Sequence, residues 1–187
     1  MTLPTDLVVL DASSILNLYA TGRMRDILTV TPSGAGIVEY VLQKEALFVR
    51  GTDPSQGEIK EPVVLDPLIN EGLLRVFRLE SSAETALFVD LASQMDDGEA
   101  MTAAIAICRS CSLATDDQKA LRILSVRAPH LDVTTTLGLI RRWAEATSTP
   151  RVILEALEES MRTKASYRFS ERDPHYGWWL SAVKKRL

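Results

Sequence analysis

Carboxylate side chains occur at points of the sequence where a short apolar segment ends or a helix begins. Asp11 follows a run of four apolar residues. The pair Asp116 and Asp117 follows residues 113–115, and Glu99 begins an alanine-rich segment. Carboxylates that meet without basic partners repel one another, and this repulsion raises their pKa values. A divalent cation removes the repulsion, and ligands made only of oxygen favour Mg²⁺ or Mn²⁺.

Each of these acids also has an ordinary structural explanation. An aspartate between a strand and a helix, such as Asp11, often caps the helix. A helix dipole favours Glu99 in a first helical turn, and it equally favours Asp116 and Asp117 ahead of the following helix. Their occurrence together, among particular neighbours, therefore points to a site more strongly than any one of them does.

The elements that would position these acids alternate between strand and helix. We expect strands over residues 7–10, 63–65, 74–79, 113–115 and 131–134. We expect helices over residues 13–20, 37–49, 67–71, 82–95, 99–108, 118–126, 136–147 and 152–161, and a turn-rich loop over 51–57. This alternation predicts an α/β fold in which helices cover both faces of a parallel sheet. The functional crevice of such a sheet lies beyond the carboxyl ends of its strands, where the acids would meet.

Three segments carry a resemblance to a known family: Val8-Val-Leu-Asp11-Ala-Ser13-Ser-Ile-Leu, Asp97-Gly-Glu99-Ala100 and Leu113-Ala-Thr115-Asp-Asp117. They resemble the motifs of PIN-domain ribonucleases, which include the VapC-type toxins of toxin–antitoxin pairs. The resemblance covers roughly residues 6–140. It implies a three-layer α/β/α sandwich over residues 1–148, cleavage of RNA that depends on Mg²⁺ or Mn²⁺, a homodimer and a cognate antitoxin.

The family motifs can be carried over residue by residue. Asp11 matches the first acid, Glu99 the third and Asp117 the fourth, although neighbouring Asp116 could share or take that last role. The hydroxyls expected to support the acids are those of Ser13 and Thr115.

The second acid of the family matches less directly. The family usually has a valine, two further residues and then the glutamate, whereas the stretch from Val41 to Glu45 is one residue longer. Glu39 is the alternative, but it lies six positions earlier and therefore on a different helical face. We prefer Glu45, because the residues around it read most like the family segment.

The same acids suit the hydrolysis of a phosphodiester bond. This reaction needs an activated water, neutralisation of phosphate oxygens and support for the leaving oxygen, and divalent ions can supply all three. Asp11, Glu99 and Asp117 would be the inner ligands, while Glu45 would hold a second ion or orient a water. The expected products carry a 5′-phosphate and a 3′-hydroxyl.

The net charge of −4 hides an uneven distribution of charge along the chain. Residues 1–150 contain 13 basic and 20 acidic groups, and residues 151–187 contain 8 basic and 5 acidic groups. We expect residues 149–187 to form a helical extension, basic and rich in aromatic side chains. Its candidate RNA contacts are Arg168, Arg172, Lys184 and Lys185. The alternative is that its tryptophans pack a terminal helix onto the domain.

The remaining composition limits the location and class of the protein. The chain has two cysteines, no apolar run long enough to cross a bilayer, and no basic flank and apolar region typical of a secretory signal at its start. We therefore expect a cytoplasmic protein without a membrane partner. A second hypothesis is a PIN-like module that binds RNA or protein without catalysis.

Overall fold

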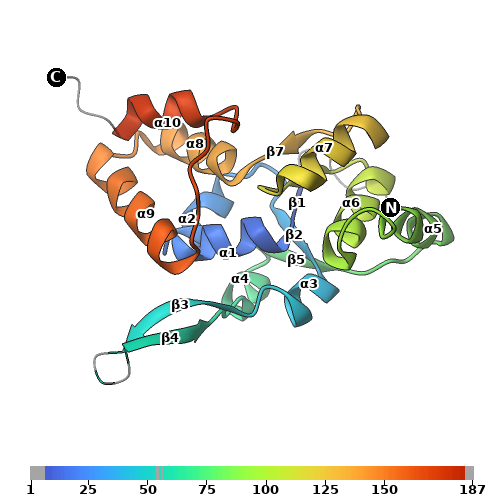
Figure 1. The fold of residues 1–187 in the computed structure, drawn as a ribbon, viewed down its shortest axis with the longest axis horizontal. Coiled ribbons are helices and arrows are strands. Elements are labelled where there is room, and N and C mark those ends of the chain that lie inside the picture. The colour runs from blue at the N-terminus through green and yellow to red at the C-terminus, as the bar shows by residue number, and fades with distance from the viewer. Residues whose placement is uncertain (1–6, 54, 56, 184–187) are drawn as a thin grey trace.

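Five short parallel strands form the central sheet of the protein, in the order β5-β2-β1-β6-β7. The computed structural model describes residues 7–53, 55 and 57–183 (Figure 1). The strands of the sheet are β1 (Val8–Leu10), β2 (Ala35–Val38), β5 (Leu74–Phe77), β6 (Ser112–Ala114) and β7 (Val133–Thr134). The fold is therefore α/β with a parallel sheet, as the alternating pattern predicts.

The three central strands are short and buried along their whole length. Every residue of β1, β2 and β6 is buried, which is expected for strands that helices cover on both faces. In β2, Gly36 faces the ring of Phe77 on neighbouring β5, and a Cβ at this position would overlap that ring. The absence of a side chain at Gly36 thus leaves room for the Phe77 ring.

Helices cover the sheet on both sides (Figure 1). The helices are α1 (Ala12–Ala20), α2 (Met24–Thr29), α3 (Glu39–Lys44), α4 (Asp66–Asn70), α5 (Ser82–Leu91), α6 (Asp97–Arg109), α7 (Gln118–Arg127), α8 (Thr136–Thr147), α9 (Arg151–Lys164) and α10 (Tyr176–Val183). α6 packs against β1, β2 and β6, and α5 packs outside it. α1, α2 and α8 contact one another on the opposite side of the sheet. This arrangement is the expected α/β/α sandwich.

The C-terminal extension packs onto this second helical layer. α9 lies against α1, where Ser160 Oγ donates a 2.6 Å hydrogen bond to the carbonyl of Ala20, and α10 contacts α8 and α9. Trp179 is 1% exposed and stacks on Phe169, whose ring also meets Tyr167 edge to face. The packing interpretation of these aromatic side chains is therefore confirmed. None of the described helices has the length and apolar character that crossing a membrane requires.

The segment between β2 and α4 differs most from the sequence prediction. The helix expected over 37–49 is confirmed only for residues 39–44, which form α3, because its first two residues belong to β2 and its last two begin a new strand. The expected loop 51–57 instead continues an antiparallel hairpin of β3 (Phe48–Asp53) and β4 (Gly57–Pro62), and residues 63–65 form no strand. Apolar residues at helical spacing produced the error, since buried strands of four residues have no distinguishing period.

Candidate functional site

Asp11 stands at the carboxyl end of β1 and joins three structural elements. Its carboxylate caps α1 by accepting a 2.8 Å hydrogen bond from the backbone N–H of Ser14 and a 2.9 Å bond from Ser13 Oγ. Thr115 Oγ1, after β6, donates to the other carboxylate oxygen. Burial raises the pKa of Asp11, and the bond from Thr115 opposes that shift most. Asp11 therefore caps α1 and also links the carboxyl ends of β1 and β6.

Asp116 is held by hydrogen bonds from two other elements. Asn17 Nδ2 of α1 donates to it at 2.7 Å, and Thr136 of α8 donates through its backbone N–H at 3.0 Å and through its hydroxyl. The backbone N–H of Asp116 donates in turn to Ser13 Oγ at 3.2 Å. Burial and the nearby charge of Asp11, opposed by the Thr136 hydroxyl, raise the pKa of Asp116 to about 6. These bonds already engage both of its carboxylate oxygens.

Asp117 begins the next helix and is linked to Asp11 through one hydroxyl. One of its carboxylate oxygens caps α7 by accepting 2.7 Å bonds from the backbone N–H groups of Lys119 and Ala120. Its own N–H donates to Thr115 Oγ1 at 3.1 Å. The Thr115 hydroxyl thus contacts both aspartates, in the supporting position that the sequence predicts for it.

Glu99 lies in the first turn of α6, where it faces the same group of acids. Its carboxylate accepts a 3.3 Å bond from the backbone N–H of Asp96 and completes a capping box. Burial, together with the charges of Asp117, Asp96 and Asp11, raises the pKa of Glu99 to about 6. Asp11, Glu99 and Asp117 therefore interact electrostatically, as expected for acids gathered at the edge of the sheet.

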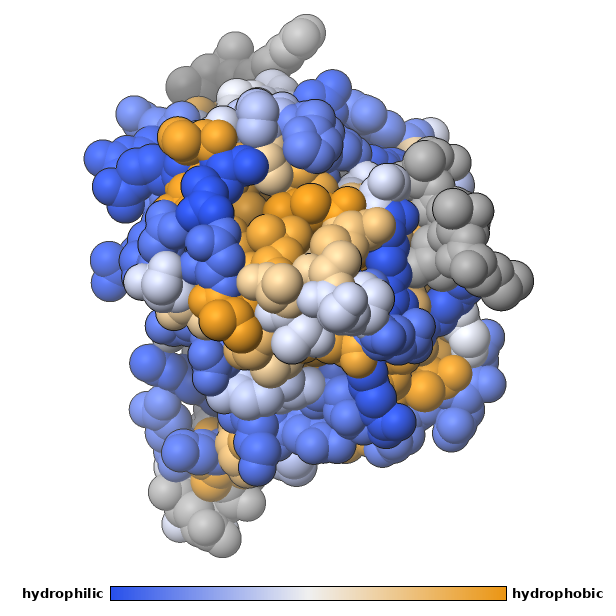
Figure 2. All heavy atoms as spheres, turned by 90° about the vertical axis from the view of Figure 1, so that its right-hand side faces the viewer, coloured by the Kyte–Doolittle hydropathy of each residue, from blue (hydrophilic) through white to orange (hydrophobic). Residues whose placement is uncertain are grey.

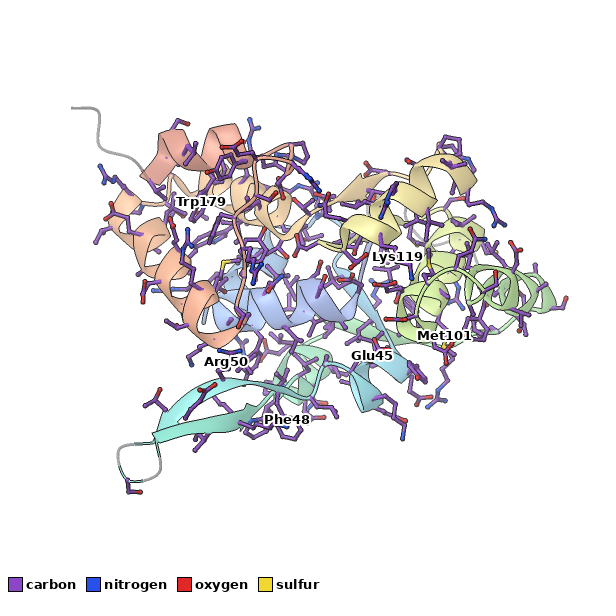
Figure 3. All side chains as sticks on the ribbon, viewed as in Figure 1. Glu45, Phe48, Arg50, Met101, Lys119 and Trp179 are labelled. Atoms are coloured by element: carbon purple, nitrogen blue, oxygen red, sulfur yellow. The ribbon has the colours of Figure 1, made fainter. Side chains whose placement is uncertain are left out.

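The two candidates for the second acid have different surroundings. Glu45 lies just after α3 (Figure 3). Its carboxylate lies against the backbone of Gly98, the residue before Glu99. Burial raises the pKa of Glu45, and a hydrogen bond from the Gly98 backbone opposes that shift. Glu39 instead pairs with Arg78, whose Nε donates at 2.7 Å and lowers the pKa of Glu39. The structure thus brings Glu45, and not Glu39, to the start of α6.

The chemistry of these donors fits a hard divalent cation. Asp11, Glu45, Glu99 and Asp117 offer only oxygen, and within the described ranges none of them forms an ion pair. As the side chains stand, however, no three His, Cys, Asp or Glu side chains of the described residues form a group that could hold a metal ion. Glu99 and Asp117 each accept a capping bond on their own helix instead.

Two of the four candidate RNA contacts in the extension, Arg168 and Arg172, lie within the described residues. Arg168 and Arg172 are exposed in the stretch between α9 and α10, and within the described part of the chain neither forms an ion pair. Lys184 and Lys185 lie outside the described residues.

Three residues of the site were not identified from the sequence. Asn17 and Thr136 hold Asp116, and Gly98 contacts Glu45. Asn17 lies one helical turn after Ser13, so helical spacing from the first motif was a usable signal. Thr136 follows a strand at the same edge of the sheet, and this placement was also a usable signal. Gly98 belongs to the second motif, but only its tertiary contact with Glu45 identifies its role in the site.

Comparisons of this chain with protein-family models, with curated proteins and with solved structures found no match. The likeness to PIN-domain ribonucleases stays a resemblance carried by the three segments around Asp11, Glu99 and Asp117. The function has to be inferred from the residues of this chain and their geometry.

Proposed function

We propose that this protein is a ribonuclease that hydrolyses RNA phosphodiester bonds with the help of Mg²⁺ or Mn²⁺. One observation carries the proposal: Asp11, Glu99 and Asp117 interact at the carboxyl edge of a parallel sheet without a cationic partner among the described residues. Their burial and mutual repulsion raise the pKa of Glu99 to about 6. Acids with shifted pKa values that lie beyond the carboxyl ends of the strands in an α/β fold are typical of functional sites.

Each acid of the site has a distinct role in this proposal. Asp11, Glu99 and Asp117 would hold the cation, with Asp116 beside them, and Glu45 would orient a water or hold a second ion. When bound, the cation supplies an activated water and neutralises the phosphate. Ser13 and Thr115 keep the Asp11 carboxylate in one orientation through their hydrogen bonds.

The biological setting of the proposal follows from the resemblance to VapC-type toxins. In that setting the protein is cytoplasmic, forms a homodimer and is held inactive by a cognate antitoxin. Co-purification of the chain with the product of an adjacent gene for a small DNA-binding protein would support this part of the proposal.

Cleavage of a structured RNA by the purified protein tests the nuclease proposal. We expect cleavage with Mg²⁺ or Mn²⁺, none with a chelator, and products with a 5′-phosphate. The variant Asp11→Asn keeps a good helix cap and should fold, but it should lose cleavage. Glu39→Gln is the matched control, because it removes an acid of an exposed ion pair outside the site. Absence of cleavage with either metal, together with equal Mn²⁺ binding by Asp11→Asn, would refute the proposal.

A second candidate function is a module that binds RNA or protein without catalysis. The capping bonds favour it, since Asp11, Glu99 and Asp117 each stabilise the start of a helix. Calorimetry with Mn²⁺ separates the two functions. No heat at the acidic site, alongside intact RNA affinity, would favour the binding module.

A further inference from the structure

A groove with a positively charged lining runs along α7, the helix that Asp117 caps. It has a volume of about 580 Å³, and we call it the α7 groove. Its lining consists of Gln94, Lys119, Arg122, Ile123, Val126 and Arg127. This lining contains three cationic side chains and no carboxylate. Its charge is therefore opposite to that of the neighbouring acidic site.

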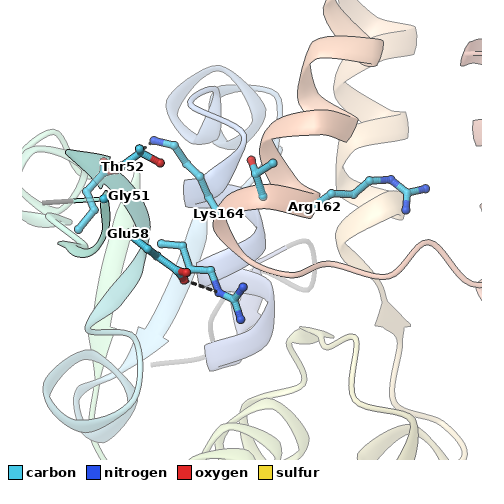
Figure 4. A pocket seen from close by; sticks show the side chains of 9 residues that line it. Gly51, Thr52, Glu58, Arg162 and Lys164 are labelled. Atoms are coloured by element: carbon cyan, nitrogen blue, oxygen red, sulfur yellow. Dashed lines mark hydrogen bonds and ion pairs between the residues drawn. The ribbon is translucent and has the colours of Figure 1, made fainter. Parts of the chain in front are cut away.

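A second cavity of similar size differs from the α7 groove in the pairing of its charges. This cavity of about 630 Å³ lies between the β3–β4 hairpin and the end of α9 (Figure 4). Each of its three cations is paired with an acid: Arg50 lies 3.5 Å from Glu58, Lys164 lies 3.0 Å from Glu61, and Arg162 lies 2.8 Å from Glu158. It therefore offers a bound anion little uncompensated positive charge.

The cations of the α7 groove are less neutralised. Arg127 pairs with Asp90, but within the described residues Lys119 and Arg122 form no ion pair. Both of these side chains are exposed. Lys119 and Arg122 are three residues apart on one helix, so they project from the same face about 5–6 Å apart at their Cβ atoms. Two free cations thus stand in a row that begins beside the acidic site.

The α7 groove and the acidic site share one helix, because Asp117 caps α7 and Lys119 lies in its first turn. The backbone N–H of Lys119 donates a 2.7 Å bond to Asp117, and in Figure 3 Lys119 lies where α7 approaches α6. The face that carries α5, α6 and α7 shows apolar side chains bordered by hydrophilic ones (Figure 2). Val126 is 77% exposed on α7. A chain that leaves the acidic site along α7 would meet free cations and then an apolar surface.

We propose that the α7 groove binds the backbone of a single-stranded segment of RNA next to the bond that is cleaved. This inference rests on the proposed nuclease function and names the surface that positions its substrate. Lys119 and Arg122 contact successive phosphates, while Ile123 and Val126 contact ribose and base faces. Such cations offset the repulsion that the acidic site imposes on an approaching phosphate chain.

Charge and position favour RNA over a protein partner at the α7 groove. Phosphate contacts need cations without competing carboxylates, and the lining meets this requirement. The first of these cations is Lys119, whose backbone N–H donates to Asp117 of the acidic site. An RNA strand bound along α7 would therefore begin next to the acids. A second copy of the chain would need the apolar part of the face and would not need Lys119.

Salt-dependent binding of a labelled 20-nucleotide oligouridylate, measured in chelator to prevent cleavage, tests the proposal. The double variant Lys119→Gln/Arg122→Gln removes two phosphate contacts. Its plot of log affinity against log salt should be less steep by about 1.4, since each contact to a single strand contributes about 0.7. The matched control is Arg75→Gln/Arg142→Gln, which neutralises two exposed cations on β5 and α8 that have no acid partner in the described chain. It should bind like the wild type.

The outcomes separate this proposal from the nuclease proposal. Weaker and less salt-dependent binding by the α7 double variant supports RNA binding in the groove. If, in addition, the wild-type protein cleaves no RNA with metal and Asp11→Asn binds Mn²⁺ equally well, the nuclease proposal alone is refuted. Metal-dependent cleavage by the wild type, with unchanged binding slope in the double variant, refutes the groove alone. A change in oligomeric mass in the double variant, with unchanged RNA affinity, assigns the surface to a second copy and also overturns the proposal.

Discussion

The contact between Gly98 and Glu45 provides a sharp test of the acidic site. A Cβ at residue 98 would overlap the carboxylate of Glu45, which is the far end of a flexible side chain. Gly98 lies in the first turn of α6 and its backbone does not require glycine for a positive φ. Gly98→Ala should therefore leave the helix intact and move Glu45 away from the start of α6.

The opposing contributions of Gly98→Ala to stability nearly cancel. Alanine in place of glycine favours a helix by about 0.8–1.0 kcal/mol. Loss of the hydrogen bond from the Gly98 backbone to the half-buried Glu45 carboxylate costs about 1–1.5 kcal/mol, because water replaces part of it. The free energy of unfolding should change by less than about 1 kcal/mol, which is about 2–4 °C in melting temperature. Catalysis, in contrast, should fall about 10–100-fold, as for lost support of a metal site.

Two assays on four proteins decide this prediction: urea unfolding and RNA cleavage, for the wild type, Gly98→Ala, Glu45→Gln and the double variant. If Gly98→Ala acts by displacing Glu45, the double variant should be no slower than Glu45→Gln alone. Full activity in Gly98→Ala would refute the assignment of Glu45 to the site. Losses that multiply in the double variant would show that Gly98 acts independently of Glu45.

Three further predictions concern pH and stability. The pKa of Glu99 is about 6 in the folded protein, against an ordinary value of 4.5. At a pH between these two values, Glu99 therefore keeps a proton in the folded protein that it has released in the unfolded chain. The free energy of unfolding should therefore fall as the pH rises from 4.5 to about 6. Glu99→Gln removes this titration, so the urea midpoint of the variant, measured with chelator, should depend less on pH. An unchanged pH dependence would contradict this prediction. Arg109→Met leaves Glu84 buried without its 2.6 Å partner and should cost about 3–5 kcal/mol in urea unfolding, and a loss below about 1 kcal/mol would count against a structural role for the pair. Trp179→Ala should cost about 3–5 kcal/mol in thermal unfolding, and a smaller loss would show that the extension adds little to the core.

The sequence predicted those parts of the fold in which local pattern and final environment agree. The helices expected from residues 82, 118 and 136 begin where the sequence pattern puts them. It failed at Ile37 and Val38, whose spacing fits a helix but which lie in a strand between β1 and β5. The hairpin was also missed, since its hydrogen bonds join residues across a turn-rich segment.

For the candidate site, the sequence by itself determined which acids follow strands. Asp11, Asp116 and Asp117 had to reach one edge, because the carboxyl ends of parallel strands share that edge. Only the tertiary structure decided that Glu45 lies against the start of α6 while Glu39 pairs with Arg78. The physical reason is that this choice depends on the contact between Glu45 and Gly98, which are 53 positions apart in the sequence and meet only in the folded chain.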